Sequence, residues 1–159
     1  MLYQLKKIAR RLLGNERGTQ TIEFAIVFPS LILLFAGTTE LGRLFYTYNS
    51  LAKATRAGAR YLSSTANAST SSTAAKNVVL CGDPGGCGST GHPDIILPNF
   101  SASNVVVTLP ATSGTGPKYV TISITGYNYR PVVFDLSAMT GANFVIPINV
   151  STTMRYMHN

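Results

Sequence analysis

The sequence predicts an α+β protein in which a long N-terminal transmembrane helix continues into a small antiparallel β head. Three observations carry this prediction. An uncharged, apolar run extends from Phe24 to Thr39, an apolar periodicity of three and four residues continues to about residue 63, and residues 77–159 show the two-residue alternation of β-strands. A chain of 159 residues is long enough for one small domain with such an extension, but too short for two full domains.

The apolar run is the candidate membrane span. Its 16 uncharged residues, Phe24–Thr39, fall short of the roughly 20 that cross a bilayer. The helix gains the missing length by continuing to Phe45, with Arg43 reaching back toward the interface. Pro29 is expected to kink the helix, because it lacks a backbone donor and crowds the preceding turn. A secretory signal peptide also has a basic start and an apolar run, but here no small-residue cleavage site closes the run.

Charge is concentrated at the N-terminal end of the chain. The sequence holds 13 basic and 6 acidic residues, a formal net charge of +7, and only 12% charged residues in all. Five basic residues precede position 18 and only four follow Arg60, so the β-rich part has no compact basic patch for phosphates. We therefore expect no nucleic-acid binding. Because no Glu follows Glu40, we also expect no enzymatic activity and no metal or cofactor site.

Glu23 stands at the start of the apolar run, where a carboxylate is costly and needs a positive partner. One interpretation is a favourable charge near the helix N-terminus. The surrounding sequence, Arg17-Gly-Thr-Gln-Thr-Ile-Glu-Phe24, favours another, because it resembles the processing site of type IV pilin-like proteins. In that family a membrane-embedded prepilin peptidase cuts after the glycine. The resemblance implies cleavage between Gly18 and Thr19, which removes the basic leader 1–18 and makes Glu23 the fifth residue of the mature chain.

Cleavage would also give Glu23 a positive partner. The new α-amine at Thr19 has a reference pKa of about 8 and is mostly cationic at neutral pH. When subunits pack side by side in lipid, the carboxylate of one can neutralise the amine of the next, and the low dielectric strengthens this attraction. The resemblance therefore implies that Glu23 fixes the axial register between neighbouring helices.

The resemblance extends beyond the leader. The segment Gly18-Thr-Gln-Thr-Ile-Glu-Phe-Ala-Ile-Val-Phe-Pro29, the motif Glu40-Leu-Gly-Arg-Leu-Phe-Tyr46 and an Ala/Arg-rich extension to Arg60 are similar to the TadE-like family, the pseudopilins of Flp/Tad pili. This likeness covers roughly residues 16–60. It implies a pilin-like fold, with residues 19–63 as the transmembrane and extended helix, and a non-enzymatic minor pilin or pseudopilin in adhesion or secretion machinery.

The family resemblance also implies partners and a location. The partners are the prepilin peptidase, other pilins or pseudopilins, the Tad assembly platform and inner-membrane lipid. The location is the bacterial inner membrane, crossed once, with the N-terminus cytoplasmic and the head periplasmic or extracellular, or a pilus into which the chain is incorporated. The alternative from another functional class is an exported monotopic binding domain held by an uncleaved signal anchor.

Residues 64–76, with seven Ser or Thr and four Ala, are expected to form a linker, or the frayed end of the long helix, before the head of residues 77–159. We expect three to five antiparallel strands that pack on the C-terminal half of the long helix. Residues 119–125 alternate as a half-buried strand, and residues 144–156 keep apolar side chains on one face. Pro147 limits that last run to an edge strand or a bulge. Gly126 and Pro131 are expected to interrupt the preceding stretch, and residues 111–117 to form a hairpin loop.

Cys81 and Cys87 flank the sequence Gly-Asp-Pro-Gly-Gly, which bends easily. In an exported head this pair favours a disulfide, whose short loop would give a stabilisation at the low end of about 2–4 kcal/mol. Free thiols remain an alternative. So does a metal site, although this is not zinc-ribbon spacing and the only histidines are His92 and His158. The His92-Pro-Asp94 sequence is expected to be a solvated loop and not a catalytic site.

Overall fold

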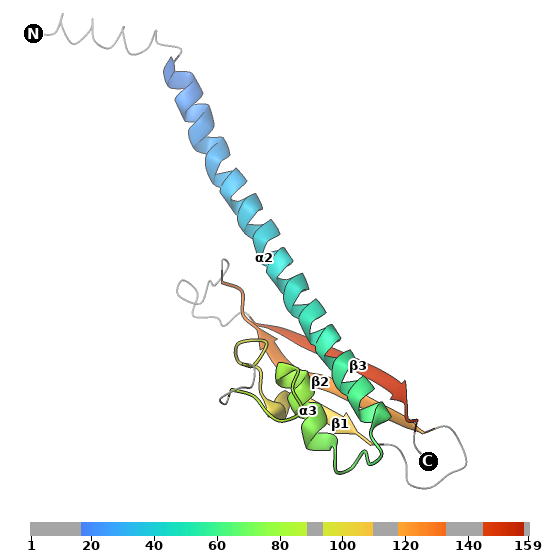
Figure 1. Ribbon diagram of the computed structural model, residues 1–159. Helices are drawn as coiled ribbons and strands as arrows, with labels where there is room; N and C mark the ends of the chain where they lie inside the picture. Colours follow the sequence, from blue (N-terminus) through green and yellow to red (C-terminus); the bar gives the residue numbers. More distant parts are fainter. Residues whose placement is uncertain (1–16, 89–93, 110–117, 133–144, 158–159) are drawn as a thin grey trace, which may run out of the picture.

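The computed structural model describes residues 17–88, 94–109, 118–132 and 145–157. Its elements follow one another as α2 (Arg17–Ser64), α3 (Ser72–Cys81), the short 3-10 helix η1 (Ala102–Asn104), β1 (Val105–Thr108), β2 (Tyr119–Tyr129) and β3 (Ile146–Arg155). Figure 1 shows that the N-terminal half of α2 projects away from the head, whereas its C-terminal half lies along the sheet. The predicted α+β architecture, a long apolar helix followed by a small antiparallel sheet, is confirmed.

The sheet has three antiparallel strands in the order β1-β2-β3. β2 is central, and β3 lies at an edge, which is where a strand tolerates the missing backbone donor of Pro147. Alternate residues of β2 are buried, and alternate residues of β3 are buried or half-buried, as the two-residue alternation predicts. The hairpin loop predicted at residues 111–117 lies outside the described residues.

The sequence predicted an interruption at Gly126. In the structure β2 instead continues to Tyr129 through a β-bulge. Ile124 pairs with Val150 and Tyr127 pairs with Ile148, so two residues of β2 stand opposite one residue of β3. Gly126 adopts the left-handed conformation that the bulge requires, with φ of 71°. The extra residue reverses the alternation, and the odd-numbered Tyr127 and Tyr129 therefore face the same side as Ile124.

The head packs as two layers, with α2 and α3 on one face of the sheet. α2 contacts β2 and β3, and α3 lies beside α2 and reaches β1. The buried positions of α2 recur at three- and four-residue steps, which places them on one face of the helix. The largest fully buried side chains are Leu51, Thr55, Leu62, Val79, Val105, Val120, Ile122 and Ile124.

Helix α3 corrects the predicted linker at residues 64–76, because the second part of that segment is the first part of a helix. Its Ser- and Thr-rich start has weak helix propensity, so composition concealed it. The helix is fixed by tertiary packing of Ala75, Val79 and Leu80, which are all buried. It ends where Gly82 adopts a left-handed conformation and its N–H donates to the Val78 carbonyl. The head therefore begins with a helix at Ser72 and not with strands at residue 77.

Gly58 lies where α2, α3 and the sheet come close together. A Cβ at this position would overlap Cγ2 of Val79 and lie 3.0 Å from Cδ1 of Ile122 and 3.2 Å from the carbonyl oxygen of Ala75. The absence of a side chain thus lets α2 approach α3 and β2 together. Gly42, on the same helix, has no atom within 4 Å of an added Cβ.

Candidate functional site

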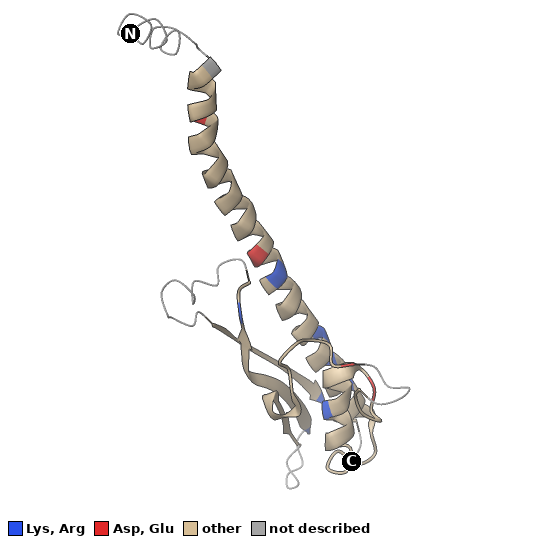
Figure 2. Cartoon of the chain, turned by 90° about the vertical axis from the view of Figure 1, so that its left-hand side faces the viewer, with Lys and Arg blue, Asp and Glu red and all other residues tan. Residues whose placement is uncertain are grey.

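The N-terminal half of α2 is an exposed apolar rod. Residues 18–39 are exposed or half-exposed along their whole length, and the 22 residues span about 33 Å, close to the hydrocarbon thickness of a bilayer. The helix is long and apolar enough to cross a membrane, and its apolar window has no buried part. Figure 2 shows that charged residues are lacking over most of this projecting half.

Hydroxyl side chains in the second half of this segment bond to their own helix. The Ser30 hydroxyl donates to the carbonyl of Val27 at 2.7 Å, the Thr38 hydroxyl to that of Phe35 at 2.9 Å and the Thr39 hydroxyl also to Phe35 at 2.8 Å. Such bonds are typical of Ser and Thr within helices. They satisfy the hydroxyls internally, as a helix in lipid requires.

The predicted processing residues all lie on this rod. Gly18 and Thr19 are in the first turn of α2, and Glu23 and Pro29 follow within the same helix. The role of Glu23, as a charge near the helix N-terminus or as a partner for a neighbouring chain, stays a prediction. Thr19 and Glu23 are four residues apart and therefore share one helix face. Pro29 lies inside the uninterrupted helix, and its predicted kink stays a prediction.

Glu40, the residue that ends the apolar rod, is the first of α2 to be buried by the head. It is 8% exposed, and its two oxygens have partners from β2 and from the segment that follows it. The Tyr129 hydroxyl donates to Oε1 of Glu40, and the Val132 backbone N–H donates to Oε2 at 3.2 Å. The nearest Arg43 nitrogen lies 3.9 Å from Oε2, which makes a charge pair one helical turn away. These contacts fix the head to the helix at the end of the apolar segment.

The carboxylate of Glu40 contributes to a raised pKa of its partner Tyr129. Burial, and after it the hydrogen bond to Glu40 and the charge of Glu40, raise the pKa of Tyr129 to about 12, and the charge of Arg43 opposes them. Tyr129 is 5% exposed and stays neutral at physiological pH, so its hydroxyl is a permanent donor to Glu40. The bulge at Gly126 makes this contact possible, because it turns Tyr129 toward α2.

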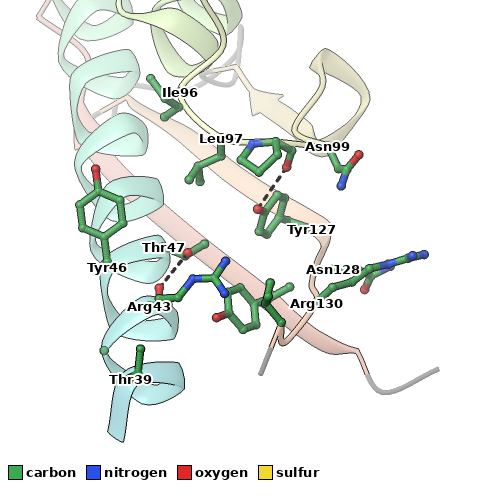
Figure 3. Close-up of a pocket in the computed structure, with 14 residues that line it drawn as sticks. Thr39, Arg43, Tyr46, Thr47, Ile96, Leu97, Asn99, Tyr127, Asn128 and Arg130 are labelled. Carbon is green, nitrogen blue, oxygen red and sulfur yellow. Dashed lines mark hydrogen bonds between the residues drawn. The ribbon is translucent and has the colours of Figure 1, made fainter. Parts of the chain in front are cut away.

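A cleft of about 650 Å³ opens beside this junction, between α2 and the C-terminal end of β2 (Figure 3). Its helical wall runs from Thr39 to Thr47, its sheet wall from Tyr127 to Val132, and residues 96–99 close one end. Figure 3 shows the Arg43 side chain extending from α2 into this space. The Tyr127 hydroxyl donates to the Pro98 carbonyl at 3.3 Å and holds the closing segment in place.

The two cysteines lie at the end of α3. Cys81 and Cys87 form a disulfide with a Cα–Cα distance of 5.7 Å, and Cys81 is 6% exposed. His92 and His158, considered above as catalytic or metal partners, lie outside the described residues. In the part of the chain that the structure describes, no three His, Cys, Asp or Glu side chains gather where they could hold a metal ion.

Fold and site together define a class of protein: a small α+β head carried on one helix that is able to span a membrane. Residues 18–60 match the model of the family described as TadE-like protein, which confirms the resemblance predicted from the sequence over that segment. The match indicates a protein associated with a Tad pilus. No curated protein and no solved structure matches the chain.

The apolar rod was predicted from the sequence, but the contact between Glu40 and Tyr129 was not. A signal for Glu40 was present, since it ends the uncharged run and is the only carboxylate between Glu23 and Asp83. A carboxylate at that point, three residues before Arg43, marks the end of a span and invites a search for its partner. No comparable signal pointed to Tyr129, which lies 89 residues away.

Proposed function

We propose that this chain is a pseudopilin or minor pilin of a Tad/Flp-type pilus, cleaved by a prepilin peptidase and assembled through the projecting half of α2. The observation that carries the proposal is the TadE-like match, which begins at Gly18 and runs the length of the apolar rod. Its start coincides with the glycine after which the leader is expected to be removed. The proposed partners are the peptidase, other pilins or pseudopilins, the Tad assembly platform and inner-membrane lipid.

The exposure of the rod supports assembly through this segment. Large apolar side chains such as Ile22, Phe24 and Phe35 are each more than 60% exposed. Apolar surface on this scale is stable only in lipid or against other apolar helices. A bundle of such helices would carry the heads at one end of their apolar segments, because Glu40 fixes each head at the same height.

We further propose that the N-terminus faces the cytoplasm and that the head is exported. The basic residues of the leader favour a cytoplasmic N-terminus. A disulfide between Cys81 and Cys87 is the kind of bond that persists in an oxidising, exported compartment. In this arrangement the new amine at Thr19 and the carboxylate of Glu23 lie at the cytoplasmic end of the span.

The leader is tested by mass spectrometry of the membrane-bound protein. We expect the mature chain to begin at Thr19, and Gly18→Val to block cleavage because a side chain crowds the backbone at the scissile bond. Gly14→Val is the matched control, since it makes the same change four residues earlier in the leader. A chain that begins at Met1 would instead support the alternative of a binding domain held by an uncleaved anchor. Cleavage of Gly18→Val at the wild-type rate would refute the site.

Glu23 is tested separately, by assembly. Glu23→Gln keeps the size of the side chain but removes its charge, so the ammonium of a neighbour's Thr19 would lose its partner in lipid, at a cost of about 3–5 kcal/mol per contact. We expect the variant to be inserted and cleaved but absent from pilin complexes. Glu23→Asp keeps the charge with a shorter reach and should assemble partly. Recovery of Glu23→Gln with its partners at wild-type yield would exclude an inter-subunit role.

A further inference from the structure

We propose that the cleft beside Glu40 binds the phosphate headgroup of an anionic phospholipid. This inference requires only that α2 crosses a membrane, and it is independent of cleavage and of assembly into a pilus. It concerns a site on the other side of the junction from the apolar rod, and it follows from the position, the charge and the space of the cleft.

Position is the first argument. If the hydrocarbon layer begins after Glu23, the roughly 20 residues that cross it end at Arg43. The helical wall of the cleft, Thr39–Thr47, spans about 12 Å along the axis and therefore straddles the boundary between hydrocarbon and headgroups. The polar layer of a bilayer is about 5–7 Å deep on each side, so the cleft opens at the depth of lipid phosphates.

Charge is the second argument. Two arginines belong to the lining of the cleft, Arg43 of α2 and Arg130, the residue that follows β2, and no Asp or Glu belongs to its described lining. The nearby carboxylate of Glu40 is engaged by the Tyr129 hydroxyl and the Val132 N–H. At 3.9 Å its contact with Arg43 is too long for a hydrogen bond, and 48% of the Arg43 side chain is exposed. A guanidinium has five N–H donors and suits a phosphate in geometry and charge.

Space is the third argument. The volume of about 650 Å³ falls in the range of small-molecule sites. Gly42 lies in the wall facing this volume, and an added Cβ there would meet no atom within 4 Å. Asn99 and Asn128 also belong to the lining, on the side away from α2. The acyl chains of such a lipid would continue along the exposed apolar side chains of the rod.

The test uses the full chain in nanodiscs made from equal parts of phosphatidylcholine and phosphatidylglycerol. Native mass spectrometry after release from the discs measures how much of each lipid stays bound. We expect preferential retention of phosphatidylglycerol by the wild type and about a tenfold loss of retention in Arg43→Gln, because a charge-assisted hydrogen bond is removed. Lys53→Gln is the matched control, since Lys53 is an exposed cation of the same helix outside the cleft.

A second variant tests whether lipid retention depends on the space of the cleft or only on its positive charge. Gly42→Leu fills the space with a side chain and leaves both arginines in place, so it should also lose retention of phosphatidylglycerol. Gly42→Leu also tests the proposal if Arg43→Gln fails to fold, because a side chain at this open helical position leaves the Glu40 contacts in place. Wild-type retention by Gly42→Leu, or an equal loss in Lys53→Gln, would overturn the proposal.

The remaining outcomes distinguish other sources of the anion. Inorganic phosphate is titrated against the protein in discs of phosphatidylcholine alone, and ³¹P NMR detects its binding. Binding of free phosphate that Arg43→Gln abolishes, without any preference for phosphatidylglycerol, would identify a site for a soluble anion and overturn the lipid assignment. An acidic polypeptide that copurifies with the wild type but not with Arg43→Gln, again without lipid preference, would overturn it in favour of a protein partner.

Discussion

Residues 18–39 and residues 40–64 belong to one uninterrupted helix, but only the second segment is packed against the head. The first segment is exposed or half-exposed throughout, whereas the second buries Leu51, Thr55 and Leu62 completely. Tertiary burial therefore stabilises only half of α2 within this chain. The other half must obtain its stability from lipid or from other helices, where every backbone hydrogen bond is internal to the helix.

The boundary between the segments is chemical as well as geometric. Between Glu23 and Glu40 the side chains are apolar or are hydroxyls that bond back to the helix. From Glu40 onward one face of the helix packs against the head. Glu40 draws its partners from β2 and the residues that follow it, so the head is held where the apolar segment ends. The comparison predicts that equal substitutions have unequal effects on the two sides of this boundary.

The largest difference is expected between two Leu→Ala substitutions. Leu51 is 0% exposed, and Leu51→Ala should reduce the free energy of unfolding of the head by about 2–5 kcal/mol, because it leaves a cavity. Leu33 is 62% exposed, and Leu33→Ala should change it by less than about 0.5 kcal/mol. Denaturant unfolding in detergent, followed by tyrosine near-UV circular dichroism, measures both. Similar losses would mean that the rod also packs on the head.

A glycine pair sharpens the comparison within the packed segment. Gly58→Ala introduces a methyl group that overlaps Val79, and we expect a loss of about 1–3 kcal/mol. Gly42→Ala has open space and should stabilise the helix by up to about 1 kcal/mol. Thermal unfolding measures both: the midpoint temperature should fall below that of the wild type in Gly58→Ala and rise above it in Gly42→Ala. A neutral Gly58→Ala would show that α3 can move away from α2 at little cost.

The disulfide is expected to matter for the head and not for the rod. Replacing Cys81 and Cys87 together by Ser should lower the stability of the head by about 2 kcal/mol, because the closed loop is short. Reductant should destabilise the wild type by a similar amount and leave the double variant unchanged. Alkylation before and after reduction checks the oxidation state, and complete alkylation of freshly isolated, unreduced protein would rule the bond out.

The smallest effect is expected at the boundary itself. Tyr129→Phe removes the hydroxyl donated to Glu40 and keeps the ring, at a cost of about 1.5 kcal/mol. The pKa of Tyr129 is raised in the folded state from 10.0 to about 12, so its contribution is complete below pH about 10 and is lost as the pH rises through about 12. The stability difference between wild type and variant should therefore disappear over this interval. A stability difference that persists above this pH interval would show that Tyr129→Phe acts through packing and not through the hydrogen bond.

Much of this fold was accessible from the sequence because its signals are local. The periodicity to residue 63 predicted a helix that ends at Ser64, and the alternation along β2 and β3 predicted their buried faces. The motifs from Gly18 to Arg60 pointed to the family that matches the same segment. Each of these signals is repeated over many neighbouring residues, so single exceptions do not obscure it.

The features that were missed depend on contacts between distant residues. α3 forms because Ala75 and Val79 have α2 to pack against, although their local sequence is rich in Ser and Thr. Gly126 is a bulge and not a break, and only the pairing with β3 reveals that Tyr129 faces the helix. Glu40 could be singled out from its position, but its partner could not, because no sequence pattern links the two.

The end of β3 is tied to the end of α2, and this has a mechanical consequence. The Met157 N–H donates to the Ser63 carbonyl at 3.1 Å, and the Tyr156 hydroxyl donates to the carbonyls of Thr65 and Ala66, both at 3.0 Å. Figure 1 shows that these ends meet at the pole of the head farthest from the apolar rod. A tensile force applied at residue 157 therefore reaches the C-terminal end of α2 directly, through Ser63 and the two residues that follow the helix, and is carried along its axis without first loading α3 or β1.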